Sequence, residues 1–350
     1  MLEARTAPSS ACPDCGTEVA EHFLICPGCH RLIHADRLKA LAAEAERAER
    51  AGDSTAALVA WRSALELLPA ASRQHEMIRQ KVGALVQVVD STPGARPRSG
   101  ESNARAKWSG GAAAGGVGTI GLMLWKFKFL GLMILGKGKL LLLGLTKAST
   151  LFSMFLSFGV YWSLWGWPFA AGLIVSIYIH EMGHVAALVR YGIRAEAPMF
   201  IPGFGAVIRA RQHLASARED ARVGLAGPVW GLGAALAFAG AYAATGLPIL
   251  AGIARLGAWI NLFNLIPIWQ LDGGRAFNAF NRSQRWFATL AVSAAWAVTE
   301  ESVLMLVLIG AAYRSAFTAP AKETDQPSVI VYVALVALLA VLTQLPVPMP

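Results

Sequence analysis

The sequence predicts a mainly α-helical, polytopic membrane protein with a small cysteine-containing head at its N-terminus. Of the 350 residues, 55% are hydrophobic and 15% are charged, and the mean hydropathy is +0.48. This composition is too apolar for an ordinary soluble enzyme. Apolar runs near the length of a membrane-spanning helix recur after residue 148, whereas the cysteines all precede residue 30. We therefore expect a helical bundle of about six spans, preceded by a small cytosolic domain.

The cysteines form two pairs within the segment 11–34, which contains C-P-D-C and then C-P-G-C. Each pair can present two thiolates to one tetrahedral ion, since proline and glycine supply the tight turns. The chain opens without the apolar core of a signal peptide, so we expect a cytosolic N-terminus, where reducing conditions disfavour disulfides. His30 and His34 are expected at the surface. The prediction is a zinc ribbon with one structural Zn²⁺, four free thiols being the alternative, and its ligands are Cys12, Cys15, Cys26 and Cys29.

Residues 35–90 change to Ala, Glu, Arg and Leu at helical spacing, which predicts at least a helical hairpin. The run from Ala48 to Pro69 resembles one tetratricopeptide unit, with Gly52 separating two helices and Pro69 ending the second. A simple hairpin is an equally good interpretation, because a stable array needs about three such units. Either structure suits a docking or regulatory module that binds a cytosolic protein.

Two further segments separate this head from the apolar part of the chain. Residues 91–118 are rich in Pro, Gly, Ser and Arg without apolar periodicity, which indicates a flexible linker. Residues 119–147 are apolar but carry several lysines, each of which would cost about 2.5–3.5 kcal/mol at the bilayer centre. We therefore expect an interfacial amphipathic segment whose lysines reach the headgroups. These lysines are Lys126, Lys128, Lys137, Lys139 and Lys147.

The remaining residues, 148–346, contain the candidate spans. Arginines that follow the second and fourth spans place those ends in the cytoplasm, and such basic residues match lipid headgroups better than nucleic acid, which we do not expect as a partner. The protein is expected in the cell membrane. The last long stretch can be divided into two crossings at Glu300 and Glu301. The predicted spans cover 148–165, 167–189, 223–243, 247–266, 286–313 and 329–346.

The second span contains the motif H-E-x-x-H. The i, i+4 spacing sets His180 and His184 on one helical face, where their imidazoles can bind one metal ion. Glu181 lies beside that face and can accept a proton from a water that attacks a carbonyl, as in zinc peptidases. Ionisable side chains in an apolar helix are costly and need metal ligation or mutual pairing. A structural metal or a transport site would satisfy the same requirement.

A second segment supplies a third candidate ligand. Residues 264–274 place Asp272 at the cytoplasmic end of the fourth span, on the same side of the membrane as His184. Pro267 breaks the helix, so that non-helical backbone can line a polar cavity. A helix cap or an interfacial carboxylate is the alternative role for Asp272.

Together, H-E-x-x-H at 180–184 and N-x-x-P-x-x-x-L-D-G at 264–273 resemble the paired signature of the site-2 proteases, peptidase family M50. The resemblance covers about residues 150–320 and leaves out the N-terminal head. It implies that a catalytic Zn²⁺ is bound by His180, His184 and Asp272 and that Glu181 is the general base. It also implies that Asn264 helps to polarise the scissile carbonyl or to hold the oxyanion.

The resemblance further implies a strand or re-entrant loop at 203–207, where an unwound substrate could add as a strand. The expected substrate-binding residues are Gly203, Gly205 and Pro267. The function predicted is hydrolysis of a peptide bond within or near a transmembrane helix of a membrane protein substrate. A membrane adaptor with a structural metal site and a protein-binding head is the alternative, and an ion carrier is a third, although the spans offer few further acidic residues.

Overall fold

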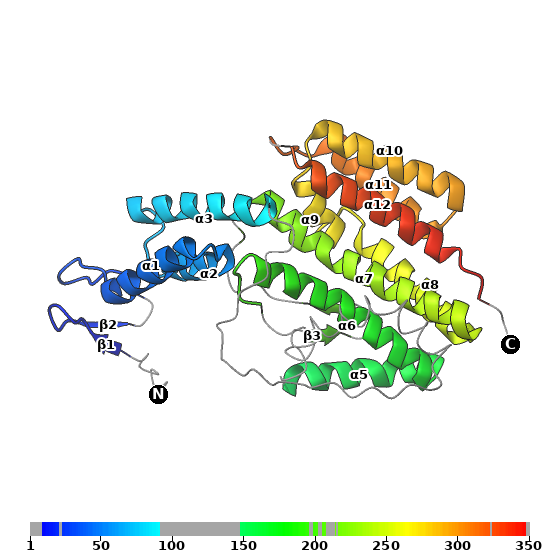
Figure 1. Cartoon of the computed structure of the whole chain (residues 1–350), viewed down its shortest axis with the longest axis horizontal. Coiled ribbons are helices and arrows are strands. Elements are labelled where there is room, and N and C mark those ends of the chain that lie inside the picture. The colour runs from blue at the N-terminus through cyan, green and yellow to red at the C-terminus, as the bar shows by residue number, and fades with distance from the viewer. Residues whose placement is uncertain are drawn as a thin grey trace, which may run out of the picture. The chain divides into compact units, whose positions relative to one another are not determined.

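The computed structural model describes residues 9–20, 23–91, 148–195, 199–201, 205–207, 214, 216–322 and 324–347. The prediction of a mainly helical protein is confirmed (Figure 1). By their contacts the residues divide into two units, of which the first comprises Met1–Arg98, Leu188–Arg194 and Ala210–Glu219, and the second comprises the rest. The predicted linker and the interfacial segment 119–147 lie outside the described residues, apart from Ser91.

The first unit begins with a small β-structure around the cysteines. Strand β1 (Ser9–Ala11) pairs antiparallel with β2 (Glu18–Ala20), and a single bridge joins Ile25 to Leu32. Each cysteine pair occupies a tight turn, closed by backbone bonds from Gly16 N–H to the Cys12 carbonyl and from His30 N–H to the Cys26 carbonyl. The two turns therefore present their thiols to a common point.

Three helices follow, α1 (Ala35–Arg50), α2 (Ser54–Leu65) and α3 (Arg73–Ser91). Gly52 adopts φ +72° between α1 and α2, a left-handed conformation that glycine tolerates best. The Asp53 side chain then caps α2 by accepting a bond from the Ala56 N–H. Small residues and Leu58 pack inside this hairpin, and the Trp61 indole donates to Glu49 of α1. The tetratricopeptide-like hairpin stays a prediction, since one helix pair does not identify the repeat.

The first unit also includes the end of α6 (Trp167–Arg190) and the start of α7 (Ala217–Thr245). Arg62 of α2 forms a buried ion pair with Glu219, and their side chains are 4% and 0% exposed. Arg62 Nε also donates to the Tyr191 carbonyl, at 3.0 Å. The Tyr191 hydroxyl donates to Asp90, and Arg190 donates to the Val89 carbonyl. Helices α2 and α3 therefore contact the end of α6 and the start of α7, and the remaining residues of these two helices belong to the second unit.

The second unit is a helical bundle with one short hairpin. Helix α8 packs against α11 and α12, and α10 packs against the same two helices, so these four form one core. Strands β3 and β4 pair antiparallel, with Met199 opposite Val207 and Ile201 opposite Gly205, and β3 lies beside α5. Besides α6 and α7, the elements are α5 (Ala148–Trp165), β3 (Met199–Ile201), β4 (Gly205–Val207), α8 (Pro248–Asn264), α9 (Asp272–Asn278), α10 (Arg282–Thr299), α11 (Ser302–Phe317) and α12 (Gln326–Thr343).

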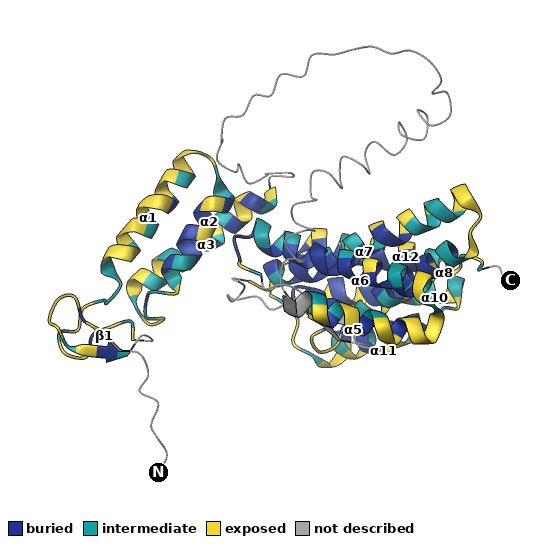
Figure 2. Cartoon of the chain, turned by 90° about the horizontal axis from the view of Figure 1, so that it is seen from below, coloured by how far each residue is buried: buried dark blue, intermediate teal, exposed yellow. Residues whose placement is uncertain are grey.

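Among the described residues, three helices are long and apolar enough to cross a membrane, namely α6, α7 and α12, while α5 and α11 are shorter apolar helices. Burial differs among the three, because 72% of the apolar window of α6 is buried against 44% for each of the others. Figure 2 shows α6 largely in the colour of buried residues and much of α5 in that of exposed ones. Of these three helices, α6 has the largest buried share, and it contains the H-E-x-x-H motif.

The prediction of one continuous helix over 286–313 is wrong, because the stretch divides into two helices at Glu300 and Glu301. That each of them crosses the membrane stays a prediction. Helix α10 ends at Thr299 and α11 begins at Ser302. Glu300 lies between them with φ +52°, so the chain reverses where two carboxylates would be costly inside a continuous apolar helix. The helices α10 and α11 then pack against one another as a hairpin.

Replacing Arg62 with Ala is expected to destabilise the protein by about 3–5 kcal/mol, because Glu219 would lose its buried guanidinium partner. Thermal unfolding in detergent would measure this change. Arg79→Ala is the matched control, since the Arg79 pair with Glu76 is solvent-exposed and its loss should hardly change the Tm. Equal unfolding temperatures for the two variants would contradict the structural importance of the buried pair.

Candidate metal centres

Helix α6 places two imidazoles at one buried point. His180 and His184 are 5% and 7% exposed, and one helical turn separates them. Their Nε2 atoms lie 3.2 Å apart, with the rings at an edge-to-face angle of 76°. The two rings are therefore not stacked face to face, and their Nε2 atoms point to a common position.

Asp272 brings a carboxylate to the same point from a different helix. It is the first residue of α9 and is 7% exposed. Its Oδ2 lies 3.3 Å from Nε2 of His180, and its Oδ1 lies 3.4 Å from Nε2 of His184. The spatial relation that the two motifs predicted is thus present.

A tight turn sets this position of Asp272. Residues 265–271 leave the helical path between α8 and α9, and a Cβ on Gly273 would lie 1.9 Å from the Leu265 carbonyl oxygen. A side chain at position 273 would push this residue away from the backbone at Leu265 and open the turn. The Tyr332 hydroxyl of α12 donates to the same Leu265 carbonyl at 2.9 Å. Glycine and a buried tyrosine together keep the turn closed.

The spacing of the donors matches a zinc ion. A tetrahedral Zn²⁺ with nitrogen and oxygen ligands at 2.0–2.1 Å holds neighbouring donor atoms about 3.4 Å apart. The two Nε2 atoms are 3.2 Å apart, and each lies 3.3–3.4 Å from a different carboxylate oxygen of Asp272. Among the described residues, no fourth His, Cys, Asp or Glu belongs to this group. A metal held here would keep one coordination position open.

The outer nitrogens of both imidazoles also have partners. His184 Nδ1 lies 2.8 Å from the Val223 carbonyl of α7, and His180 Nδ1 lies 2.8 Å from the side-chain oxygen of Asn261 in α8. Such acceptors keep the proton on Nδ1 and leave Nε2 free for a metal. Sequence reasoning missed Asn261. The available signal was a polar residue in the middle of an apolar helix.

Helix α7 approaches the histidines closely because it carries glycine where they face it. A Cβ on Gly227 would lie 2.2 Å from Nε2 of His184 and 2.8 Å from Nε2 of His180. On α6, a Cβ on Gly183 would lie 2.4 Å from the Ala226 carbonyl oxygen. Small residues on both helices therefore let the two backbones come together, as is common between membrane helices. The A-G-P segment at 226–228 supplies this contact.

The structure places the other predicted site residues as follows. Glu181 is buried on α6 beside the donor face, and Asn264 is the half-buried last residue of α8. Gly205 begins strand β4, whereas Gly203 lies outside the described residues. Pro267 is buried, with Gly310 of α11 close by. The roles of these five residues stay predictions.

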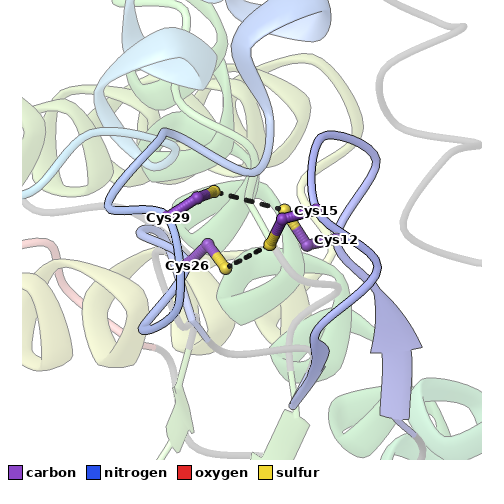
Figure 3. A group of neighbouring side chains, drawn as sticks. All are labelled: Cys12, Cys15, Cys26 and Cys29. Carbon is purple, nitrogen blue, oxygen red and sulfur yellow. Dashed lines mark hydrogen bonds between the residues drawn. The ribbon is translucent and has the colours of Figure 1, made fainter.

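The four cysteines form a second group of donors in the first unit (Figure 3). Sγ of Cys12 lies 3.8 Å from Sγ of Cys29, and Sγ of Cys15 lies 3.5 Å from Sγ of Cys26. A tetrahedral zinc ion with sulfur ligands at 2.3 Å requires sulfur separations of about 3.8 Å. The two turns therefore offer four thiols at a spacing that suits Zn²⁺.

Hydrogen bonds favour the thiolate form of two cysteines in this second group, whereas burial and the neighbouring thiols raise the pKa of the Cys29 thiol to about 12. Bonds from the Thr17 side chain and backbone lower the pKa of the Cys15 thiol to about 6. The backbone amide of Cys29, together with that of Gly28, lowers the pKa of the Cys26 thiol. A thiolate is the form that binds metal, so these hydrogen bonds prepare the sulfurs of Cys15 and Cys26 for an ion.

Comparisons with known proteins match the region that contains the histidines. Residues 168–247 match the family model of peptidase family M50. A zinc metalloprotease of Methanocaldococcus jannaschii is 30% identical over 112 residues, which are 31% of this chain and 32% of that relative. The chain thus matches about a third of the relative's length, and no solved structure matches significantly. The resemblance to family M50 stated from the motifs is confirmed for this segment.

Cys26→Ser is expected to remove the metal of the cysteine group, because one of four ligands would be lost at a buried position. Zinc content of the purified full chain, measured by elemental analysis, tests this. His30→Ala serves as the control, since His30 adjoins the turn without belonging to the donor group. Equal zinc loss in both variants would contradict ligation by these cysteines.

Gly227→Ala is expected to remove metal from the histidine group while the cysteine group keeps its ion. The added methyl group would occupy space 2.2 Å from a donor nitrogen. Gly240→Ala on the same helix is the matched control, because a Cβ there has no atom within 4 Å. Metal content resolved by chelator competition would show the difference, and a Gly227→Ala protein with full zinc would refute the proposed position of the ion.

Proposed function

We propose that this chain is a zinc-dependent intramembrane endopeptidase of the site-2 protease type, starting from the match of residues 168–247 to peptidase family M50. The observation that carries the proposal is the buried group of His180, His184 and Asp272. The two Nε2 atoms lie 3.2 Å apart on the apolar helix α6, and each is 3.3–3.4 Å from one of the two carboxylate oxygens of Asp272 in α9. Three ligands with an open fourth position are typical of catalytic rather than structural zinc.

In this proposal the three donors hold Zn²⁺, which supplies Lewis acidity and lowers the pKa of a water to about 7. Glu181 accepts the proton of the attacking water, because it follows His180 directly and lies buried beside the donor face. Asn264 donates through its amide to the carbonyl oxygen of the substrate as negative charge develops there. The outer partners of the imidazoles keep their Nε2 atoms directed to the metal.

The proposed substrate is a transmembrane helix of another membrane protein. Its peptide bond must leave the helical conformation before hydrolysis, because a helical carbonyl is already hydrogen-bonded and shielded. The hairpin of β3 and β4 supports this step, since an unwound segment can pair with a free strand edge. Gly203 and Gly205 would allow the close approach of the substrate backbone, and Pro267 would help to shape the cavity.

The location and the head complete the proposal. The apolar helices indicate an integral membrane protein, which we place in the cell membrane with its N-terminus in the cytosol. The cysteine group would hold a structural Zn²⁺, and α1 to α3 would offer a surface to a cytosolic protein. A membrane adaptor with a closed structural metal site is the weaker alternative, because the described residues bring three donors to the histidine group and leave one position open.

Glu181→Gln is expected to retain zinc and to lower the rate of cleavage about 10²–10⁴-fold, since glutamine cannot accept the proton. Comparative proteomics of membranes from cells with the wild type or the variant would measure this through transmembrane fragments. Fragments found only with the wild type would also identify the substrate. Glu301→Gln, at the turn before α11, is the control and should cleave like the wild type. Unchanged fragments from a zinc-loaded Glu181→Gln protein would refute the assignment.

A further inference from the structure

We infer that Asn261 is a positioning residue of the histidine centre, and that its amide oxygen sets the tautomer and orientation of the His180 imidazole. This inference rests on the proposed function, because it concerns the zinc ligand set. Sequence motifs single out Asn264, three residues further along α8. The geometry assigns a separate role to Asn261.

The contact between the two side chains is direct and enclosed. The Asn261 oxygen lies 2.8 Å from Nδ1 of His180, and the two residues are 2% and 5% exposed. On the opposite side of the ring, Nε2 faces the carboxylate of Asp272 at 3.3 Å. An imidazole that binds a metal through Nε2 carries its proton on Nδ1 and therefore requires an acceptor there. Asn261 provides that acceptor.

A second hydrogen bond determines which end of the amide faces the histidine. The Asn261 Nδ2 group donates to the Gly257 carbonyl, one turn earlier in α8, at 2.7 Å. Reversal of the amide would place its oxygen against a carbonyl oxygen and its N–H groups against the Nδ1 proton. The arrangement with oxygen toward His180 satisfies both groups. Asn261 thus selects one tautomer rather than accommodating either.

Helix α7 leaves room for this amide at one residue. A Cβ on Gly231 would lie 2.0 Å from the Asn261 oxygen and 2.5 Å from its nitrogen. The imidazole, the amide and the glycine come from α6, α8 and α7, so three helices meet at one hydrogen bond. A buried amide between apolar helices is costly unless fully bonded, and here both of its ends have partners.

The two histidines differ in the kind of outer partner they have. His184 contacts the backbone carbonyl of Val223, which no side-chain substitution removes. His180 contacts the side chain of Asn261, so a substitution at Asn261 can change the orientation of the His180 ring without replacing a metal ligand. Substitution of an outer partner of a metal-bound histidine typically weakens metal binding about 10–100-fold. The expected effect of losing Asn261 is therefore on zinc affinity, before any effect on the chemical step.

The first experiment compares zinc affinities of full-length Asn261→Leu, Asn261→Asp and Asn264→Leu by chelator competition. Leucine keeps the volume and removes the acceptor, so affinity should fall about 10–100-fold. Aspartate keeps the acceptor for Nδ1 but loses the bond to the Gly257 carbonyl, so it should lose less affinity than leucine without restoring the wild-type value. Asn264→Leu should bind zinc like the wild type while losing cleavage. Equal affinities for wild type and Asn261→Leu would overturn the inference.

The second experiment moves the amide without changing it. Gly231→Ala should weaken zinc binding as Asn261→Leu does, because its methyl group displaces the Asn261 oxygen. Gly233→Ala is the matched control, since a Cβ there has nothing within 4 Å. The double variant Gly231→Ala/Asn261→Ala should lose no more affinity than Asn261→Ala alone, because alanine has no amide for the added methyl group to displace. Additive losses would overturn the inference.

Further readouts separate this inference from misfolding and from the proposed function. Zinc in the cysteine group and the unfolding temperature report whether each variant has folded. With Co²⁺ in place of zinc, the visible spectrum of Asn261→Leu should shift, whereas that of Asn264→Leu should match the wild type. A wild-type chain that binds no metal at the histidines would refute the proposed function itself. Tight wild-type binding with an unshifted Asn261→Leu spectrum would refute only the role of Asn261.

Discussion

The convergence of two imidazoles and one carboxylate at a buried point is the constraint on which the second unit depends. Polar groups of this kind are costly among apolar helices unless they bind an ion or one another. His180, His184 and Asp272 meet this condition through donor separations that suit one zinc ion. The surrounding helices are arranged so that these three side chains can reach each other. A zinc ion held by these three side chains would have one coordination position left.

Backbone proximity is what makes the arrangement possible. Gly227 and Gly231 of α7 leave space for the histidines and for Asn261, while Gly273 allows the turn that delivers Asp272. Larger side chains at these positions would separate the helices. The far side of α9 is held by Arg285, whose buried guanidinium donates to carbonyls at the ends of α9 and α11. Satisfied carbonyls at helix ends keep α9, and with it Asp272, in place.

Buried polar contacts join α2 and α3 of the head to the start of α7 and the end of α6. The Arg62–Glu219 pair is buried within the first unit, at the start of α7, and Tyr191 at the end of α6 bonds to Asp90. Asp220, the next residue of α7, pairs with Arg275 of α9 within the second unit. The adjacent residues Glu219 and Asp220 therefore pair with two different arginines, Arg62 and Arg275.

The sequence by itself determined the helices and the three donors, because hydropathy and i, i+4 spacing act locally and the two motifs identify their own residues. It allowed the division of 286–313 without deciding it. Only the tertiary structure decided that Asn261, rather than Asn264, faces Nδ1 of His180, and that Gly227 and Gly231 leave room for the histidines and for Asn261. Those facts depend on which helices lie side by side. Contacts between α6, α7 and α8 join residues far apart in the chain, and no local periodicity encodes them.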